Sequence, residues 1–230
     1  MHQGATNTVL LVCDVWDNHY CKDLQRRMGP LAERIDKFAS IVRQRGGHVL
    51  HCPSQTVDTY YNSWPQRKTM RKYPFARPVI SEKMQTVKLP LDTTLTTGCP
   101  DIPPCPVHSD FTKQHEGIKI LPRDLISDSG QEVYNFIKAE NIDCVLMTGT
   151  VLNMCIMGRP FGVQALVNRR IPVRVVGDLV EVFYSPLESP NISIDQAKWF
   201  ILGYIKAKWC PVTTTYKELL DVSCCKVTYP

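Results

Sequence analysis

The sequence predicts an α/β fold: a three-layer α/β/α sandwich around a mostly parallel sheet of about six strands. Two observations support this prediction. The chain contains short, unbroken apolar runs, and these runs alternate with longer segments whose apolar residues recur at helical spacing. Such alternation is typical of a parallel sheet with helices on both faces. The 230 residues, 43% hydrophobic and 21% charged, have the composition of an ordinary globular protein, and we expect a single domain over 1–230.

The first expected strand is Thr8–Val15 (TVLLVCDV), an apolar run that contains an acid, Asp14, near its end. A run without polar alternation is typical of a parallel strand that is buried on both faces. A helical stripe over 31–45 follows and ends at Gly46–Gly47, a pair that favours helix termination. Val49–Cys52 is then expected as the second strand.

Residues 53–116 differ from the rest of the chain. They hold most of its 17 prolines and show little periodicity. A structureless loop of this length is unusual within a domain. We therefore predict an irregular insertion at about 53–116, packed over the edge of the functional site, with one short helix near Tyr60–Lys72.

The second half of the chain resumes the alternation of strands and helices. The expected elements, in order, are a strand at 117–121, a helix at 129–140, a strand from 144 to about 149, a helix beginning near 155, a strand at 173–176, a helix at 192–209 and a strand at 211–215.

Two chemically active side chains fall near the carboxyl ends of strands, where parallel α/β sheets bind ligands. Asp14 follows the first strand, and Cys155 lies where a helix should begin. A helix N-terminus lowers the pKa of a thiol and favours a nucleophile. A neighbouring acid can take the thiol proton and later deliver it to a leaving amine. The alternatives are a turn residue for Asp14 and a buried helix thiol for Cys155.

The loop after the first strand adds Trp16, Asp17 and His19, which we expect to line the substrate pocket. The alternative is an exposed loop. Asp14, Asp17 and His19 could bind a metal by residue type, but their spacing fits no ligand pattern. The ten cysteines include no CxxC pair, and the adjacent Cys224 and Cys225 are poorly spaced for structural zinc. The sequence thus predicts no metal and no other cofactor.

Charge and hydropathy limit the partners. The net charge is +5, but the strongest basic cluster, within 67–72, is short and typical of a solvated surface. No GxGxxG follows the first strand, so a dinucleotide site is not indicated. No apolar stretch reaches membrane-spanning length, and residues 1–8 have no apolar signal core. We expect a cytoplasmic protein with a small-molecule substrate, without nucleic-acid or membrane partners.

Two motifs, LLVCDVWD and GTVLNMCIMGRPFGVQALVNRRIPVRVVGD, resemble those of the isochorismatase-like cysteine hydrolases, which include nicotinamidases and N-carbamoylsarcosine amidase. The resemblance implies a three-layer α/β/α sandwich that assembles into a homo-oligomer. It also implies that Asp14 is the general acid/base and Cys155 the nucleophile. The Thr150–Val151 peptide would be cis, and the backbone N–H groups of Val151 and Cys155 would form the oxyanion hole.

The chain departs from this family at the third catalytic residue, a lysine at the end of the third strand. Counting back from Gly130 places Pro122 in that position. Lys119 and Arg123 are the basic residues that could replace it. If neither does, the thiolate and Asp14 would form an unrelieved pair of like charges.

Arg159 and Pro160 interrupt the first turns of the helix that follows Cys155. Pro160 lacks a backbone N–H and should kink the helix. Arg159 is expected either to bind an anionic substrate group or to form a surface ion pair.

The preferred functional hypothesis is hydrolysis of a C–N bond in a small amide, carbamoyl or ureido compound through a Cys155 thioester. The alternatives are a non-catalytic binding or assembly protein that keeps the fold without the lysine, and a metal-dependent hydrolase.

Overall fold

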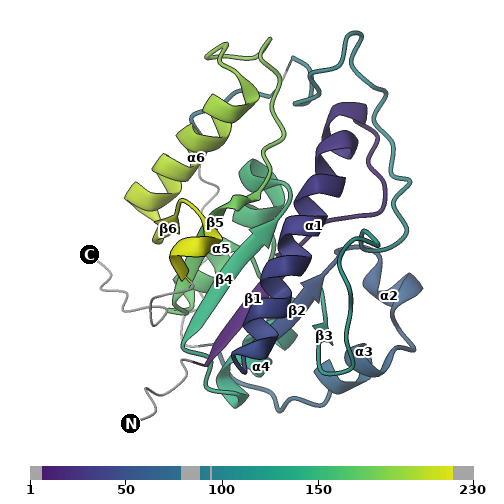
Figure 1. Ribbon diagram of the computed structural model, residues 1–230, viewed down its shortest axis with the longest axis vertical. Helices are drawn as coiled ribbons and strands as arrows, with labels where there is room; N and C mark the ends of the chain where they lie inside the picture. Colours follow the sequence, from purple (N-terminus) through teal and green to yellow (C-terminus); the bar gives the residue numbers. More distant parts are fainter. Residues whose placement is uncertain (1–6, 79–88, 94, 220–230) are drawn as a thin grey trace.

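The computed structural model describes residues 7–78, 89–93 and 95–219. One sheet has the strand order β3-β2-β1-β4-β5-β6, and every pairing in it is parallel. The predicted six-stranded parallel sheet is therefore confirmed (Figure 1). The strands are β1 (Thr8–Cys13), β2 (His48–Cys52), β3 (Leu125–Ile126), β4 (Cys144–Gly149), β5 (Val173–Val180) and β6 (Val212–Thr213).

Helices cover both faces of the sheet. In Figure 1, α1 lies in front of the strands, and α4, α5 and α6 pack in a separate apolar cluster on the other face. The helices are α1 (Lys22–Gln44), α2 (Val57–Tyr60), α3 (Pro65–Met70), α4 (Gly130–Ala139), α5 (Val163–Asn168) and α6 (Ile194–Lys208), with a π-helical turn η1 (Leu152–Ile156) and a 3-10 turn η2 (Tyr216–Leu219).

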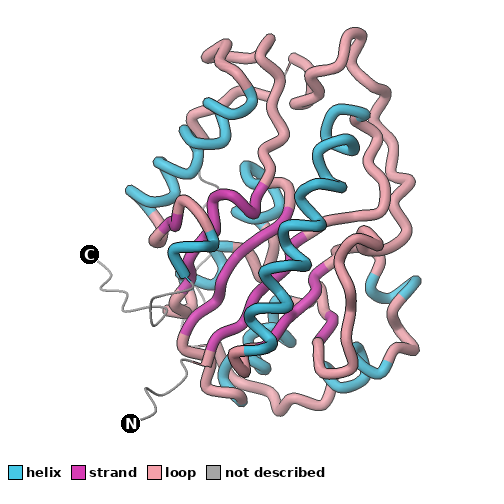
Figure 2. The backbone as a smooth tube through the Cα atoms, in the orientation of Figure 1, coloured by secondary structure: helices cyan, strands magenta, loops and turns pink. Residues whose placement is uncertain are grey.

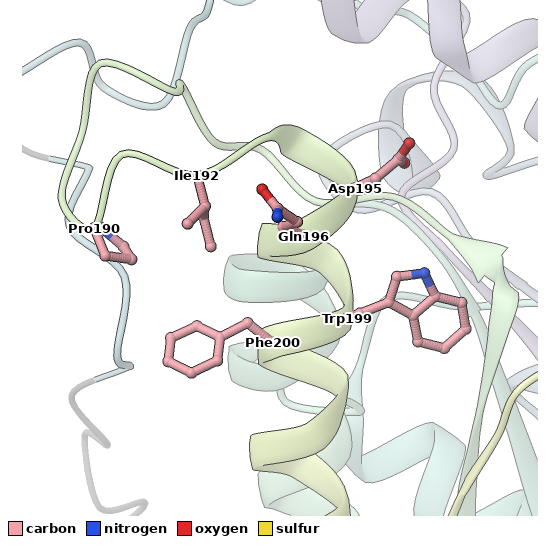
Figure 3. A pocket seen from close by; sticks show the side chains of 6 residues that line it. All are labelled: Pro190, Ile192, Asp195, Gln196, Trp199 and Phe200. Carbon is pink, nitrogen blue, oxygen red and sulfur yellow. The ribbon is translucent and has the colours of Figure 1, made fainter.

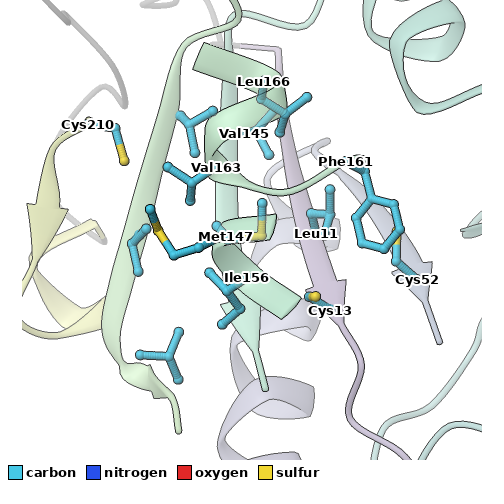
Figure 4. Close-up of a cluster of buried hydrophobic side chains, with 14 of the residues drawn as sticks. Leu11, Cys13, Cys52, Val145, Met147, Ile156, Phe161, Val163, Leu166 and Cys210 are labelled. Carbon is cyan, nitrogen blue, oxygen red and sulfur yellow. The ribbon is translucent and has the colours of Figure 1, made fainter. Parts of the chain in front are cut away.

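Strand β1 shows how the sequence produces the layers. Its side chains alternate between the two faces of the sheet because successive residues of a strand point to opposite sides. Leu10 and Val12 pack in the cluster of α1, whereas Leu11 packs in the cluster of α4, α5 and α6 (Figure 4). All three are fully buried, which contributes about 1.5–3 kcal/mol each. Burial on both faces explains the unbroken apolar run.

Helix α1 begins nine residues before the predicted start at Leu31. The buried residues Leu24 and Met28 extend the apolar stripe of the helix toward its N-terminus. Pro30 lies inside α1 and removes one backbone donor. Packing of the longer stripe outweighs this loss.

The predicted strand at 117–121 is not formed, and the third strand is β3. Backbone groups of this segment bind side chains instead of a neighbouring strand. The amide of Gln114 donates to the carbonyl of Ile118 at 3.3 Å, and the Lys119 N–H donates to Asp36 at 2.9 Å. Ile118 is nevertheless buried against the α1 cluster, which explains why this position is apolar although it lies outside a strand.

The predicted insertion at 53–116 contains α2 and α3, where one helix was expected near Tyr60–Lys72. Its remaining described residues form long irregular segments (Figure 2). Within the described residues, no helix has both the length and the apolarity required to cross a membrane. The expectation of a single domain over 1–230 stays a prediction, and Cys224 and Cys225 lie outside the described residues.

Candidate active site

Asp14 lies at the carboxyl end of the central strand β1, between β2 and β4. Its backbone N–H donates to the Cys52 carbonyl at 3.1 Å, and its side chain is fully buried. One carboxylate oxygen accepts from the Ser54 N–H at 2.8 Å. The other accepts from Arg159 Nε at 2.7 Å. Both oxygens therefore have defined partners, one of them charged.

The turn after β4 passes close to the end of β1. Gly149 has φ +117°, and a Cβ there would lie 1.9 Å from the carbonyl oxygen of Cys13. The following N–H, of Thr150, donates to that same oxygen at 2.9 Å. The peptide bond between Thr150 and Val151 is cis, as the family resemblance implied. This turn brings the start of η1 beside Asp14.

Cys155 lies on η1 and is half-buried. Burial raises the pKa of its thiol to about 12, and the negative charge of Asp14 and a hydrogen bond to that carboxylate act in the same direction. The guanidinium of Arg159 and a hydrogen bond from the backbone of Val151 lower this pKa. The thiol is therefore protonated at neutral pH, and attack requires a neighbouring base.

Arg159 lies one turn beyond Cys155, and its N–H donates to the Cys155 carbonyl at 3.0 Å. The predicted helix is interrupted at this point: η1 ends, Pro160 follows, and α5 begins only at Val163. The guanidinium contacts the buried Asp14. Burial raises the pKa of Asp14, although Arg159 and Ser54 oppose the shift. Arg159 therefore pairs with a buried carboxylate and not in a surface ion pair, and its binding of an anionic substrate group stays a prediction.

Lys119 and Arg123 are the residues predicted as replacements for the family lysine. They lie at the amino ends of the strands, whereas Asp14 lies at the carboxyl ends. Both precede β3 in the chain and are exposed. The Lys119 carbonyl accepts from Arg43, in the last turn of α1, at 3.0 Å. That turn leads into the amino end of β2. The structure does not bring Lys119 or Arg123 to Cys155, because the segment that carries them runs before β3.

Trp16 and Asp17 have different environments. Trp16 is buried, donates from Nε1 to the Ser54 carbonyl at 3.1 Å, and lies with its ring 6.0 Å from the Arg159 guanidinium. Asp17 accepts hydrogen bonds from the backbone and hydroxyl of Thr112. Burial acts to raise the pKa of Asp17, but the bonds from Thr112 dominate and lower it. Trp16 borders the site, whereas Asp17 holds a loop in place.

His19 packs against the rings of Tyr20 and Phe183, with centroids 4.5 and 5.2 Å away. Its Nδ1 accepts from the N–H of Cys21 at 3.1 Å. Burial lowers the pKa of His19 to about 4. The ring is therefore neutral at physiological pH.

The depressed pKa of His19 predicts a loss of stability in mild acid. The unfolded chain binds a proton below about pH 6.5, and the folded chain does so only near pH 4, so stability falls as the pH decreases through this window. Because the ring is partly exposed, we expect a loss of about 1 kcal/mol between pH 7 and pH 5. Urea denaturation at the two pH values measures it. His19→Asn keeps an acceptor, and an equal acid loss in that variant would contradict the assignment to His19.

Sequence reasoning did not assign the pairing of Arg159 with Asp14. A signal for it was present, since residues four apart in a helix lie on the same face. Arg159 is four residues after Cys155, so it belongs to the same face as the predicted nucleophile. The backbone N–H of Ser54, the other partner of Asp14, has no signal of residue type.

A separate open groove of about 530 Å³ lies at the start of α6. Its lining is mostly apolar and includes the exposed rings of Trp199 and Phe200 (Figure 3). Neither Asp14 nor Cys155 lines it. The groove is therefore distinct from the candidate active site.

Known structures share this architecture. No family model matches the sequence, and no curated protein matches it significantly. A cysteine hydrolase from Pseudomonas syringae pv. phaseolicola 1448A is 16% identical, with 94% of this chain and 92% of that chain covered and a TM-score of 0.58. An isochorismatase-like hydrolase from Alkaliphilus metalliredigens is 16% identical, with 95% and 97% covered and a TM-score of 0.53. An isochorismatase family protein from Desulfovibrio vulgaris subsp. vulgaris str. Hildenborough is 13% identical, with 93% and 97% covered and a TM-score of 0.52.

These similarities, together with the parallel sheet and its helical layers, define a three-layer α/β/α protein. More narrowly, the chain has the isochorismatase-like fold that its two motifs indicated.

Proposed function

We propose that the protein is a cysteine hydrolase that cleaves a C–N bond of a small amide, carbamoyl or ureido compound. The observation that supports this function best is the meeting of Asp14, Cys155 and Arg159 at the carboxyl ends of β1 and β4. Solved structures with this fold include a cysteine hydrolase and an isochorismatase-like hydrolase, which agrees with hydrolytic chemistry. The substrate is a small molecule, and no cofactor takes part.

The proposed reaction begins when Asp14 accepts the thiol proton of Cys155. The sulfur forms a bond to the carbonyl carbon, and the carbonyl electron pair moves onto oxygen. The backbone N–H groups of Val151 and Cys155 then stabilise this oxyanion. The backbone of Val151 lowers the pKa of the Cys155 thiol, which supports a role for its N–H beside the reacting sulfur.

Collapse of the intermediate expels the amine, which takes the proton held by Asp14. Water then attacks the thioester, with Asp14 accepting a water proton. The carboxylic acid product leaves, and that proton returns to Cys155. The raised pKa of Asp14 supports both directions of transfer because it brings the carboxyl closer to the pH at which it works.

In this proposal Arg159 acts by charge alone, because a guanidinium remains protonated throughout the accessible pH range. It favours the ionised form of Asp14 before attack and the thiolate as it forms. The proton transfers therefore rest on Asp14.

A second candidate function is non-catalytic binding on the same fold. It is favoured by the engagement of both Asp14 oxygens, with Ser54 and with Arg159. Each Asp14 oxygen then has one acceptor site occupied, which weakens the carboxylate as a base. Under this candidate the site binds small amides without consuming them, and calorimetry would detect binding while no amine is released.

Replacing Cys155 with alanine tests the nucleophile directly. A panel of small amides, carbamoyl compounds and ureido compounds is screened for amine or ammonia release. Mass spectrometry of the protein is used to detect the thioester adduct. We expect Cys155→Ala to hydrolyse none of the compounds that the wild type hydrolyses and to form no thioester adduct. Cys210→Ala, which alters a buried free cysteine outside the site, is the control and should retain both turnover and the adduct. Undiminished hydrolysis by Cys155→Ala would rule out the thioester.

Assembly into a homo-oligomer, a cytoplasmic location and the absence of nucleic-acid and membrane partners stay predictions from the sequence.

A further inference from the structure

Three cysteines and an aspartate gather at the N-terminus of α1. Cys21 is the residue that caps α1. The others belong to a segment of the insertion, 99–105, that passes over this end of the helix. They are Cys99, Asp101 and Cys105. The four side chains come together although Cys21 and Cys99 are 78 residues apart in the chain.

The contacts within this cluster are close and converge on a single atom. The sulfur atoms of Cys21 and Cys99 are 3.3 Å apart. One carboxylate oxygen of Asp101 lies 3.5 Å from each of these two sulfurs and 3.4 Å from the sulfur of Cys105. Cys21 and Cys99 are fully buried, and Cys105 is partly exposed.

These distances can be compared with those in a tetrahedral zinc centre. With Zn–S near 2.3 Å and Zn–O near 2.0 Å, neighbouring sulfur and oxygen ligands lie about 3.5 Å apart, and two sulfurs about 3.8 Å apart. The observed oxygen–sulfur distances agree with this geometry. The sulfurs of Cys21 and Cys99 need to separate by about half an ångström to admit the ion. The ligand atoms of Cys21, Cys99 and Asp101 already lie within 4.8 Å of one another, whereas the sulfur of Cys105 has to move toward them. Their 3.3 Å separation is well beyond the roughly 2.05 Å of a disulfide.

We propose that Cys21, Cys99, Cys105 and Asp101 bind one Zn²⁺ ion as a structural site. Three thiolates and a carboxylate form a closed tetrahedral donor set, and thiolates favour zinc over magnesium and calcium. On binding, three S–H bonds are exchanged for three Zn–S bonds, and three protons are released to solvent. No change of oxidation state is involved.

The surroundings offset the negative charge of such a donor set. The N–H of Asp23, in the first turn of α1, donates to the Asp101 oxygen at 3.0 Å. The guanidinium of Arg26 lies 3.5 Å from the other Asp101 oxygen. Helix α1 has 23 residues, and its N-terminus carries a partial positive charge. A helix end and an arginine thus face the anionic cluster.

The site would fasten the insertion beside the candidate active site. Cys21 and Cys99 pack in one apolar cluster with Val151 and Phe183. Gly98 approaches the Phe183 backbone so closely that a Cβ would lie 2.9 Å from its carbonyl oxygen. Zinc would therefore hold the segment around Cys99 against the residues next to the Val151 N–H.

The sequence predicted no metal because no CxxC pair is present. Cys21 lies far along the chain from the other three ligands. The folded chain supplies the proximity that the spacing does not.

The experiment measures zinc in the intact protein, purified under reducing conditions from zinc-supplemented medium. Elemental analysis should give one zinc per chain. Replacement by Co²⁺ should produce the strong near-ultraviolet absorption of cobalt–thiolate bonds. Cys99→Ser should lower the affinity for Zn²⁺ at least about 10-fold in a chelator competition. Cys210→Ser, a buried cysteine outside the cluster, should bind as the wild type does.

Each contrary result overturns the proposal. These results are a zinc content near zero with no cobalt–thiolate absorption, an unchanged affinity in Cys99→Ser, or a Cys21–Cys99 disulfide found by mass spectrometry in the reduced preparation. If Cys99→Ser does not fold, the cobalt titration of the wild type decides, because thiolate absorption at one equivalent requires the cluster. These readouts do not depend on hydrolytic activity, so the metal site and the proposed function can fail independently.

Discussion

Replacing Arg159 with methionine should lower hydrolytic turnover at least about 100-fold and destabilise the fold by about 3 kcal/mol. The methionine keeps much of the volume of the side chain but removes the charge that pairs with Asp14 at 2.7 Å. Asp14 is fully buried, so an unpaired carboxylate there is costly. Asp14 would bind a proton instead, and it could no longer accept one from Cys155.

Arg159→Lys separates charge from shape in this test, because it keeps the charge and should recover part of both losses. Arg71→Met is the control, since Arg71 pairs with the exposed Asp58 at 3.2 Å and should cost less than about 1 kcal/mol. Stability is measured by urea denaturation and turnover on the substrate found in the amide screen. Arg159→Met with wild-type turnover would exclude an electrostatic role for Arg159.

Replacing Gly149 with alanine should destabilise the protein by at least about 3 kcal/mol. The added Cβ would lie 1.9 Å from the Cys13 carbonyl, and Gly149 has φ +117°, a conformation that L side chains rarely adopt. The obstructing atom belongs to the backbone of β1, which pairs with β4 at this position. Relief would require the two central strands to separate at the site.

Gly203→Ala is the matched control for Gly149→Ala. Gly203 lies inside α6, and a Cβ added there would meet nothing within 4 Å beyond its own stretch of helix. Alanine there should raise stability by up to about 1 kcal/mol through its higher helix propensity. Urea denaturation of both variants gives the comparison. If Gly149→Ala leaves the stability unchanged, the turn after β4 can adopt another conformation.

The central strands β1 and β4 could be predicted because they are buried on both faces. Both are largely apolar runs without polar alternation, which is typical of parallel strands that are covered by helices on both faces. The position of Asp14 followed from the end of β1. A helical turn after β4 was also predicted, but η1 begins at Leu152, before Cys155, where the sequence placed the start of the helix.

Two local predictions, the strand at 117–121 and the start of the first helix, were wrong because tertiary packing decides the structure there. Ile118 is apolar because it packs against α1, and sequence periodicity does not distinguish that contact from a strand. Pro30 is tolerated within α1 because Leu24 and Met28 are buried on the N-terminal side of it. In both cases packing with distant residues overrides the local signal.

The family resemblance places the cation of the site near the third strand, whereas the structure brings Arg159 to Asp14 from the segment after Cys155. Its pairing with Asp14 depends on the break at Pro160 and on the approach of η1 to β1, which are properties of the folded chain. The cysteine cluster at α1 depends in the same way on the path of the insertion. The four-residue spacing indicates that Arg159 lies near Cys155, but neither its contact with Asp14 nor the cysteine cluster follows from spacing alone.

The location of Arg159 provides a criterion for choosing, among genome sequences with this fold, the proteins to test for activity. A chain without the lysine at the third strand would ordinarily be set aside as an inactive homologue. Here the residue paired with Asp14 lies four positions after the cysteine, and Pro160 follows it directly. Chains that lack the lysine can be divided by whether they keep this Cys-x-x-x-Arg-Pro arrangement. Those that keep it are the ones to clone first for substrate screening.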